Sequence, residues 1–179
     1  MEQIPLSLLL GWQNFYVIVG SSAGALTGLQ FVVMSLITNI AAPGSMQEVR
    51  AFGTPNVVHF CMALLLSATM SAPWPSLANL AYCLMALAAA GLIYSVRVIF
   101  HARRADYNPD AEDWCWYVIF PILAYTALTT GAVLLRWRPL QSLFVVAASD
   151  LLLLSVGIHN SWDTVTYLAM QRKPESAVK

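Results

Sequence analysis

Charged residues are scarce in this chain of 179 residues: Asp, Glu, Lys and Arg make up only 10%, whereas soluble domains carry about 25%. The formal net charge is zero, so the chain lacks the basic surface that binds nucleic acid. The three cysteines are too few and too scattered for a disulfide framework or a Cys-x-x-Cys metal site. These scarcities count against a soluble, disulfide-rich or nucleic-acid-binding protein.

Catalytic and nucleotide-binding signatures are missing as well. The sequence has no Gly-x-Ser-x-Gly, no His-Glu-x-x-His, no phosphate-binding loop and no dinucleotide glycine fingerprint. It also has no potassium-channel filter sequence. These absences favour a protein that is not an enzyme, and they identify no substrate.

Long hydrophobic runs take the place of these features, because 59% of the residues are hydrophobic. A helix of about 20 apolar residues crosses the hydrocarbon of a bilayer. The runs predict an all-α polytopic membrane protein, with residues 1–179 forming a single transmembrane domain that is a bundle of five transmembrane helices. We expect the spans at residues 15–38, 55–72, 77–100, 114–135 and 140–161, with Pro121 kinking the fourth and a short basic tail at residues 171–179.

Basic residues are unequally shared between the two sides of such a bundle. Five crossings put the termini on opposite sides, and the side reached after the first, third and fifth spans holds more of the cations. The positive-inside rule then predicts an N-terminus outside and a C-terminus in the cytoplasm of an integral protein, which we expect in a bacterial inner membrane. The cytoplasmic cations are Arg50, Arg103, Arg104, Arg172, Lys173 and Lys179, and those opposite are Arg136 and Arg138.

Glycines recur at every fourth position of the first span, at Gly20, Gly24 and Gly28. Small residues at this spacing let two helix backbones approach closely in lipid. The stripe therefore predicts a helix-packing face. Two partners remain open: a helix of the same chain, for which the small residues 86–91 of the third span are a candidate, or a second copy.

Asp150 lies in the middle of the longest apolar run, about 15 Å into the fifth span at 1.5 Å per residue. An ionised side chain at the bilayer centre costs about 3 kcal/mol or more. In a structural interpretation, a protonated Asp150 donates to a hydroxyl at similar depth, such as Thr27, Tyr125, Thr126 or Thr129. In a functional interpretation, its carboxylate relays protons or cations, or joins a ring formed by several copies.

A second set of polar residues gathers towards the expected cytoplasmic side: Gln30, His59, His159 and Asp163. His159 and Asp163 are four residues apart, so they share a helix face and can pair. A histidine beside an acid can ligate a metal or pass protons near neutral pH. This layer is the main candidate for the mouth of a conduction path.

The layer has two further interpretations. His59 and His159 lie at similar depths on different spans, as a bis-histidine b-type haem requires, and together with Asp163 they would supply ligands to a divalent metal. As a purely structural layer, it would include an interhelical ion pair of Arg97 with Asp113 or Asp163.

Helical geometry separates Asp150 from His159. Nine residues at 100° per residue place them about 180° apart on the fifth span, so they cannot form one compact site. Both faces then need cover from lipid, which favours a central position for this helix, or a subunit interface in a homo-oligomer. The tryptophans near span ends are predicted to form aromatic belts; they are Trp74, Trp114, Trp116, Trp137 and Trp162.

The leading functional hypothesis is a small integral membrane protein that forms an oligomeric ion channel or a transporter-like pore. Its partners would be the lipid bilayer, further copies of the chain and an ion or small solute, with Asp150 at the midplane. One alternative is a membrane redox protein that binds b-type haem or a metal. The other is a non-catalytic subunit or scaffold of a membrane complex.

Overall fold

The computed structural model describes residues 8–40, 46–102 and 111–170, and side chains within 8–36, 57–100 and 111–166. The predicted basic tail and the loop arginines at 103 and 104 lie outside these residues. Every element in the described part is helical. The elements are α2 Gln13–Ile40, α3 Met46–Ser71, α4 Leu77–Ala102, α5 Ala111–Trp114, the π-helix η1 Cys115–Ile119, α6 Phe120–Leu134 and α7 Pro139–Met170.

Four helical segments are long and apolar enough to cross a bilayer: Gln13–Leu36, Leu77–Phe100, Ala111–Leu134 and Pro139–Thr166. The remaining expected span, at residues 55–72, falls in α3. Within the described residues its apolar stretch is Val57–Ser71, which is shorter than the other four segments. The all-helical fold is therefore confirmed, and the count of five spans is not. Four apolar helices fit a membrane location.

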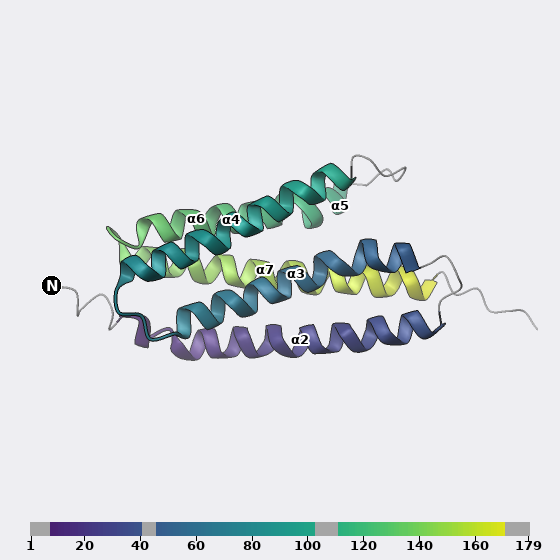
Figure 1. Cartoon of the computed structure of the whole chain (residues 1–179), viewed down its shortest axis with the longest axis horizontal. Coiled ribbons are helices and arrows are strands. Elements are labelled where there is room, and N and C mark those ends of the chain that lie inside the picture. The colour runs from purple at the N-terminus through teal and green to yellow at the C-terminus, as the bar shows by residue number, and fades with distance from the viewer. Residues whose placement is uncertain (1–7, 41–45, 103–110, 171–179) are drawn as a thin grey trace, which may run out of the picture.

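The helices form an antiparallel bundle (Figure 1). α2, α4 and α7 begin at one end, which we call the proximal end, and they finish at the opposite, distal end, where α3 and α5 begin. The main contacts join α2 to α3, α3 to α7, α7 to α6 and α6 to α4, with a smaller contact between α2 and α7. α7 thus packs against three helices, and half of its most apolar stretch is buried, in agreement with the central position expected for the fifth span.

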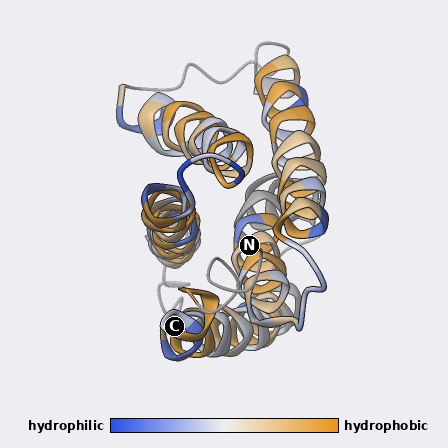
Figure 2. Cartoon of the chain, turned by 90° about the vertical axis from the view of Figure 1, so that its left-hand side faces the viewer, coloured by the Kyte–Doolittle hydropathy of each residue, from blue (hydrophilic) through white to orange (hydrophobic). Residues whose placement is uncertain are grey.

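Hydrophobic residues predominate along the helices (Figure 2), and many of them are exposed on the outside of the bundle. Large hydrophobic side chains such as Ile18, Phe31, Tyr82 and Phe144 are more than half exposed. Patches of this extent on a soluble monomer would drive association, whereas hydrocarbon solvates them at no cost. The apolar exterior therefore fits the same lipid environment as the helix lengths.

Each of the four main helix contacts contains one glycine at which a Cβ atom would collide with the neighbouring helix. The missing side chain lets the two backbones approach, which increases the van der Waals contact that drives helix association in lipid. The pairs are Gly20 with Ser67 (α2 and α3), Gly157 with Phe60 (α7 and α3), Gly131 with Val146 (α6 and α7) and Gly91 with Tyr125 (α4 and α6).

The predicted glycine stripe of α2 has a partner within the same chain. A Cβ at Gly20 would lie 2.9 Å from Ser67, and one at Gly24 would lie 3.9 Å from Leu64, both on α3. At Gly28 a Cβ would meet nothing within 4 Å among the described residues. The facing helix is thus α3 rather than the small-residue segment 86–91 of α4, because α2 and α4 are not neighbours in the bundle.

We predict that Gly157→Ala destabilises the bundle by about 1–3 kcal/mol. The new methyl group would lie 2.6 Å from the ring of Phe60, which is 1% exposed and cannot move aside. Gly28→Ala is the matched control: a Cβ there meets no described residue within 4 Å, and the higher helix propensity of alanine is worth up to about 1 kcal/mol. Equilibrium unfolding in mixed micelles measures both, and equal losses would contradict the close-contact explanation.

Candidate functional site

The carboxyl group of Asp150 is completely enclosed by protein. Its Oδ2 accepts a hydrogen bond of 2.7 Å from the hydroxyl of Ser67 on α3. Its Oδ1 is also buried, and it has no hydrogen-bond partner among the described residues. A buried oxygen without a partner is rare and costly, so it calls for an explanation.

The hydroxyl group of Tyr16, on α2, shares this environment. It is buried, is without a hydrogen-bond partner in the described part of the chain, and lies within electrostatic range of Asp150. Gly20, one turn further along α2, allows α2 to approach α3 at Ser67. We call Tyr16, Ser67 and Asp150 the carboxylate cluster; it is enclosed by α2, α3 and α7.

The cluster corrects the expected partners of Asp150. The threonines predicted as partners use their hydroxyls within their own helices: Thr27 donates to the carbonyl of Ala23, and Thr129 to that of Tyr125. α7 runs on to Met170, so Asp150 lies about a third of the way along it. Its neighbours come from the proximal parts of α2 and α3. The midplane depth of Asp150 stays a prediction.

His59 is buried on α3, eight residues before Ser67. Its Nδ1 lies 3.1 Å from the hydroxyl oxygen of Tyr125 on α6, and its ring meets that of Tyr94 on α4 edge to face. Gly91 on α4 makes room for the Tyr125 ring. The histidine is thus held by side chains from two neighbouring helices.

A π-helical turn at Cys115–Ile119 replaces the simple kink expected at Pro121. In a π-helix, the N–H of residue 121 would donate to the carbonyl of Trp116, five residues earlier. Proline has no N–H, so this carbonyl receives no hydrogen bond from Pro121. The side-chain amide of Asn160 on α7 donates to this carbonyl at 3.5 Å. The backbone defect in one helix is therefore satisfied by a polar residue of another.

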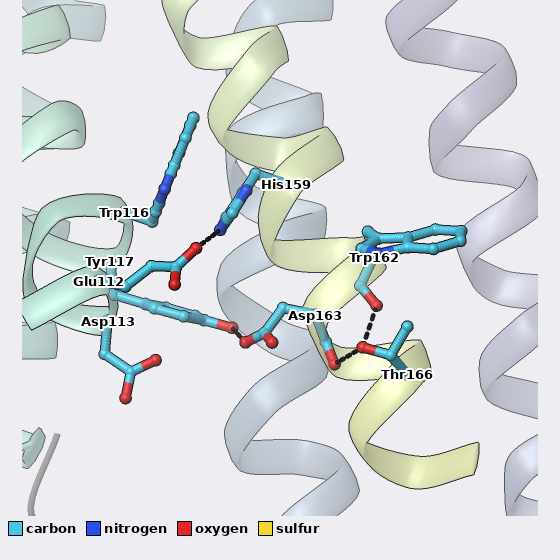
Figure 3. A pocket seen from close by; sticks show the side chains of 8 residues that line it. All are labelled: Glu112, Asp113, Trp116, Tyr117, His159, Trp162, Asp163 and Thr166. Atoms are coloured by element: carbon cyan, nitrogen blue, oxygen red, sulfur yellow. Dashed lines mark hydrogen bonds and ion pairs between the residues drawn. The ribbon is translucent and has the colours of Figure 1, made fainter. Parts of the chain in front are cut away.

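The π-turn also forms one wall of a cavity of about 280 Å³ near the distal end, which we call the distal cavity (Figure 3). One wall comes from α5 and η1 and the other from α7. The lining residues are Glu112, Asp113, Trp116, Tyr117, His159, Trp162, Asp163 and Thr166.

His159 and Asp163 each have a partner across the distal cavity rather than on their own helix. The imidazole of His159 stacks on the Trp116 ring, with the ring centroids 3.8 Å apart and the planes 11° apart. Its Nε2 lies 3.8 Å from the carboxylate of Glu112. The hydroxyl of Tyr117 donates to the carboxylate of Asp163 at 3.5 Å. The predicted His159–Asp163 pair is thus replaced by two contacts to α5 and η1.

The other predicted site residues are not brought to the distal cavity. His59 does not line it, so this cavity does not bring the two histidines together as haem ligands. Within the described ranges, no three His, Cys, Asp or Glu side chains are grouped to hold a metal ion, so His59, His159 and Asp163 are not assembled as ligands. Gln30 is buried away from the cavity, and its Nε2 lacks a hydrogen-bond partner among the side chains described. The ion pair of Arg97 with Asp113 or Asp163 stays a prediction.

Sequence reasoning missed Tyr16, Ser67, Glu112 and Tyr117, and it assigned Trp116 to an aromatic belt. One available signal was the stripe 159, 162, 163 and 166 on α7, whose i, i+3, i+4, i+7 spacing places four polar or aromatic residues on one face. A matching set at 112, 113, 116 and 117 precedes Pro121. No comparable signal marks Ser67, a single serine in an apolar helix.

Comparison with protein-family models, characterised proteins and solved structures finds no match to this chain. The interpretation of its function therefore depends on the geometry of the carboxylate cluster and the distal cavity.

We predict that Ser67→Ala destabilises the protein by about 1–3 kcal/mol, because it leaves the second oxygen of Asp150 without a partner. The same change in an Asp150→Leu background should cost far less, since no buried carboxyl then remains to be satisfied. Equilibrium unfolding in mixed micelles gives the four free energies of this double-mutant cycle. An equal cost of Ser67→Ala in both backgrounds would show that the hydrogen bond does not contribute.

A second cycle tests the contact at the π-turn. We expect Asn160→Leu to destabilise the wild type, because the Trp116 carbonyl loses its donor. In a Pro121→Ala background the restored N–H can bond within the helix, so Asn160→Leu should cost less. The coupling expected for such a bond in a membrane protein is about 0.6 kcal/mol and at most about 1.7 kcal/mol. Strictly additive losses would rule out this role for Asn160.

Proposed function

We propose that this protein is a transporter-like membrane protein that moves protons or small cations through its helix bundle, with Asp150 as the group that takes up and releases them. The observation that carries this proposal is the orphaned Oδ1 of Asp150, a fully buried carboxyl oxygen with no partner in the described residues. Ionisable residues inside membrane-spanning bundles are rare and commonly mark proton or ion paths.

The chemistry of the carboxylate cluster suits a reversible binder. Ser67 donates one hydrogen bond to Asp150, which lowers the cost of the charged form without fixing it in an ion pair. The hydroxyl of Tyr16 lies within electrostatic range of Asp150 and has no hydrogen-bond partner in the described structure. A small movement would let it accept a hydrogen bond from the neutral carboxyl or donate one to the anion. The carboxyl would then be hydrogen-bonded in both states and could change its protonation state at modest cost.

The position of Asp150 favours transport within one protomer over a ring of carboxylates from several copies. Its side chain is enclosed by α2, α3 and α7 of the same chain, not presented on an outer face. This argues for the transporter-like alternative rather than the oligomeric channel. We retain as parts of the proposal a fifth crossing by α3, an outside N-terminus and a cytoplasmic distal end.

A second polar group lies further along α3. His59 and Ser67 are eight residues apart, or about 12 Å at 1.5 Å per residue, and both are buried. His59, whose Nδ1 lies next to the Tyr125 hydroxyl, would be the next group to bind the proton or cation on its way to the distal end. The interval contains the buried apolar residue Ala63, so passage would require a conformational change rather than a continuous hydrogen-bonded chain.

The test is ion flux into proteoliposomes. We predict that wild-type protein carries protons, Na⁺ or K⁺ above the rate of empty vesicles, that Asp150→Asn abolishes this flux, and that Asp150→Glu retains part of it. Ser155→Ala is the matched control, because this serine is exposed on the same helix and its hydroxyl donates to the backbone carbonyl of Leu151, one turn earlier. It should leave the flux unchanged.

Two outcomes would contradict the proposal. Flux equal to that of empty vesicles for all three ions would favour the alternative of a non-catalytic subunit, especially if a different membrane protein copurifies in fixed proportion. Flux that Asp150→Asn leaves unaltered would remove Asp150 from the path.

A further inference from the structure

The distal cavity is lined by acidic and aromatic side chains, a combination that proton transport through Asp150 does not require. Its described lining residues include the carboxylates of Glu112 and Asp163 but no lysine or arginine. Among these described residues, the only side chain able to become cationic is His159, whose ring is stacked on that of Trp116. Acidic groups that line a concave surface attract a cation.

Two carboxylates lie next to the side chain of Tyr117 (Figure 3). Glu112 belongs to α5 and reaches towards His159, while Asp163 belongs to α7 and meets the hydroxyl of Tyr117. Glu112 thus lies beside the ring and Asp163 at its hydroxyl end. A cation placed against this ring would be close to both carboxylates.

The π-turn is what places these residues together. Helices α5 and η1 run continuously into α6, and the wide turn just before Pro121 sets Trp116 and Tyr117 on the side of α7. Asn160 fastens that turn to α7 at the Trp116 carbonyl. π-turns within α-helices are rare and recur at functional sites, so the distortion and the cavity have a common origin.

The geometry favours an organic cation over a metal ion. Within the described chain, no three His, Cys, Asp or Glu side chains converge to ligate a metal, and a space of about 280 Å³ is far larger than a bare ion needs. Ammonium groups that carry alkyl substituents are weakly hydrated, and aromatic faces stabilise them through cation–π contacts. The cavity is at the small end of ligand pockets, so the ligand is correspondingly small.

We infer that the distal cavity binds a small organic ammonium ion, with Glu112 and Asp163 as its counter-charges and the ring of Tyr117 as its aromatic contact. This binding does not depend on transport through Asp150, which lies on the opposite face of α7. Should the flux through Asp150 also be established, the cavity would define the class of cation that the protein accepts at its distal end.

The test is isothermal titration calorimetry on the full chain in detergent micelles, with choline as the probe. The control ligand is 3,3-dimethyl-1-butanol, which has the shape of choline without its charge. We expect choline to bind and the neutral isostere not to bind. Glu112→Gln and Asp163→Asn should each weaken choline binding, because each removes one of the two counter-charges.

Variants at Tyr117 separate the ring from its hydroxyl. Tyr117→Leu should weaken choline binding by about 3- to 30-fold, the range expected for one cation–π contact. Tyr117→Phe keeps the ring, and it should bind within about threefold of the wild type. Asp150→Asn should bind choline normally, so a failure of this site and a failure of the transport proposal can be told apart. Variants are compared only if their unfolding midpoints in micelles match the wild type.

Four results would overturn the inference: no choline binding by the wild type, equal binding of the neutral isostere, unchanged affinity in both Glu112→Gln and Asp163→Asn, or displacement of choline by equimolar Mg²⁺. The last would assign the cavity to an inorganic cation. Equal losses in Tyr117→Leu and Tyr117→Phe would remove the aromatic contact and leave only charge attraction.

Discussion

Hydrocarbon offers no hydrogen bonds, and this constraint governs the arrangement of polar groups throughout the bundle. Each serine or threonine within an apolar helix must find a partner inside the protein, and most find it one turn back in their own backbone. Ser22, Thr27, Ser149 and Ser155 all donate to the carbonyl four residues earlier. A hydroxyl used in this way costs little and carries no information about function. The informative groups are those that depart from this pattern. The hydroxyl of Ser67 donates to Asp150 instead of to a carbonyl of its own helix. The Trp116 carbonyl, which Pro121 leaves without a backbone donor, accepts a hydrogen bond from Asn160 on α7.

The same absence of water explains why glycine, rather than apolar bulk, determines which helices are neighbours. Leucine side chains gain nothing by leaving lipid for another helix, so association depends on close backbone approach and good packing. Each main contact of the bundle contains a glycine whose missing side chain is replaced by a side chain of the partner helix. At two of these contacts the close approach also serves the polar sites. Gly20 brings α2 to the serine that binds Asp150, and Gly91 admits the ring of Tyr125, which holds His59.

The helices themselves could be predicted from the sequence, because an apolar run of about 20 residues is typical of a helix that crosses a bilayer. The segment 77–100 agrees with the structure at both ends. The order of the helices could not be predicted, since apolar residues that face lipid and those that face protein look alike. The partners of Asp150 were missed because Ser67 is a single serine in an apolar helix, and nothing in the sequence fixes how α3 is staggered against α7. Pro121 was recognised as a distortion, but its form as a π-turn depends on the donor that Asn160 supplies from a distant part of the chain.

The opposite-face relation of Asp150 and His159, derived from helical periodicity alone, becomes the organising feature of α7. One face of this helix meets Ser67 on α3, and the other meets Trp116 and Glu112 on η1 and α5. The two polar regions also lie at different levels of α7, the first in its proximal half and the second in its distal half. Neither can contact the other directly, so each is satisfied by a different neighbour: α3 for Asp150, and α5 and η1 for His159 and Asp163. One continuous helix of 32 residues is long enough to carry both regions, and its two polar faces explain why it needs protein on opposite sides.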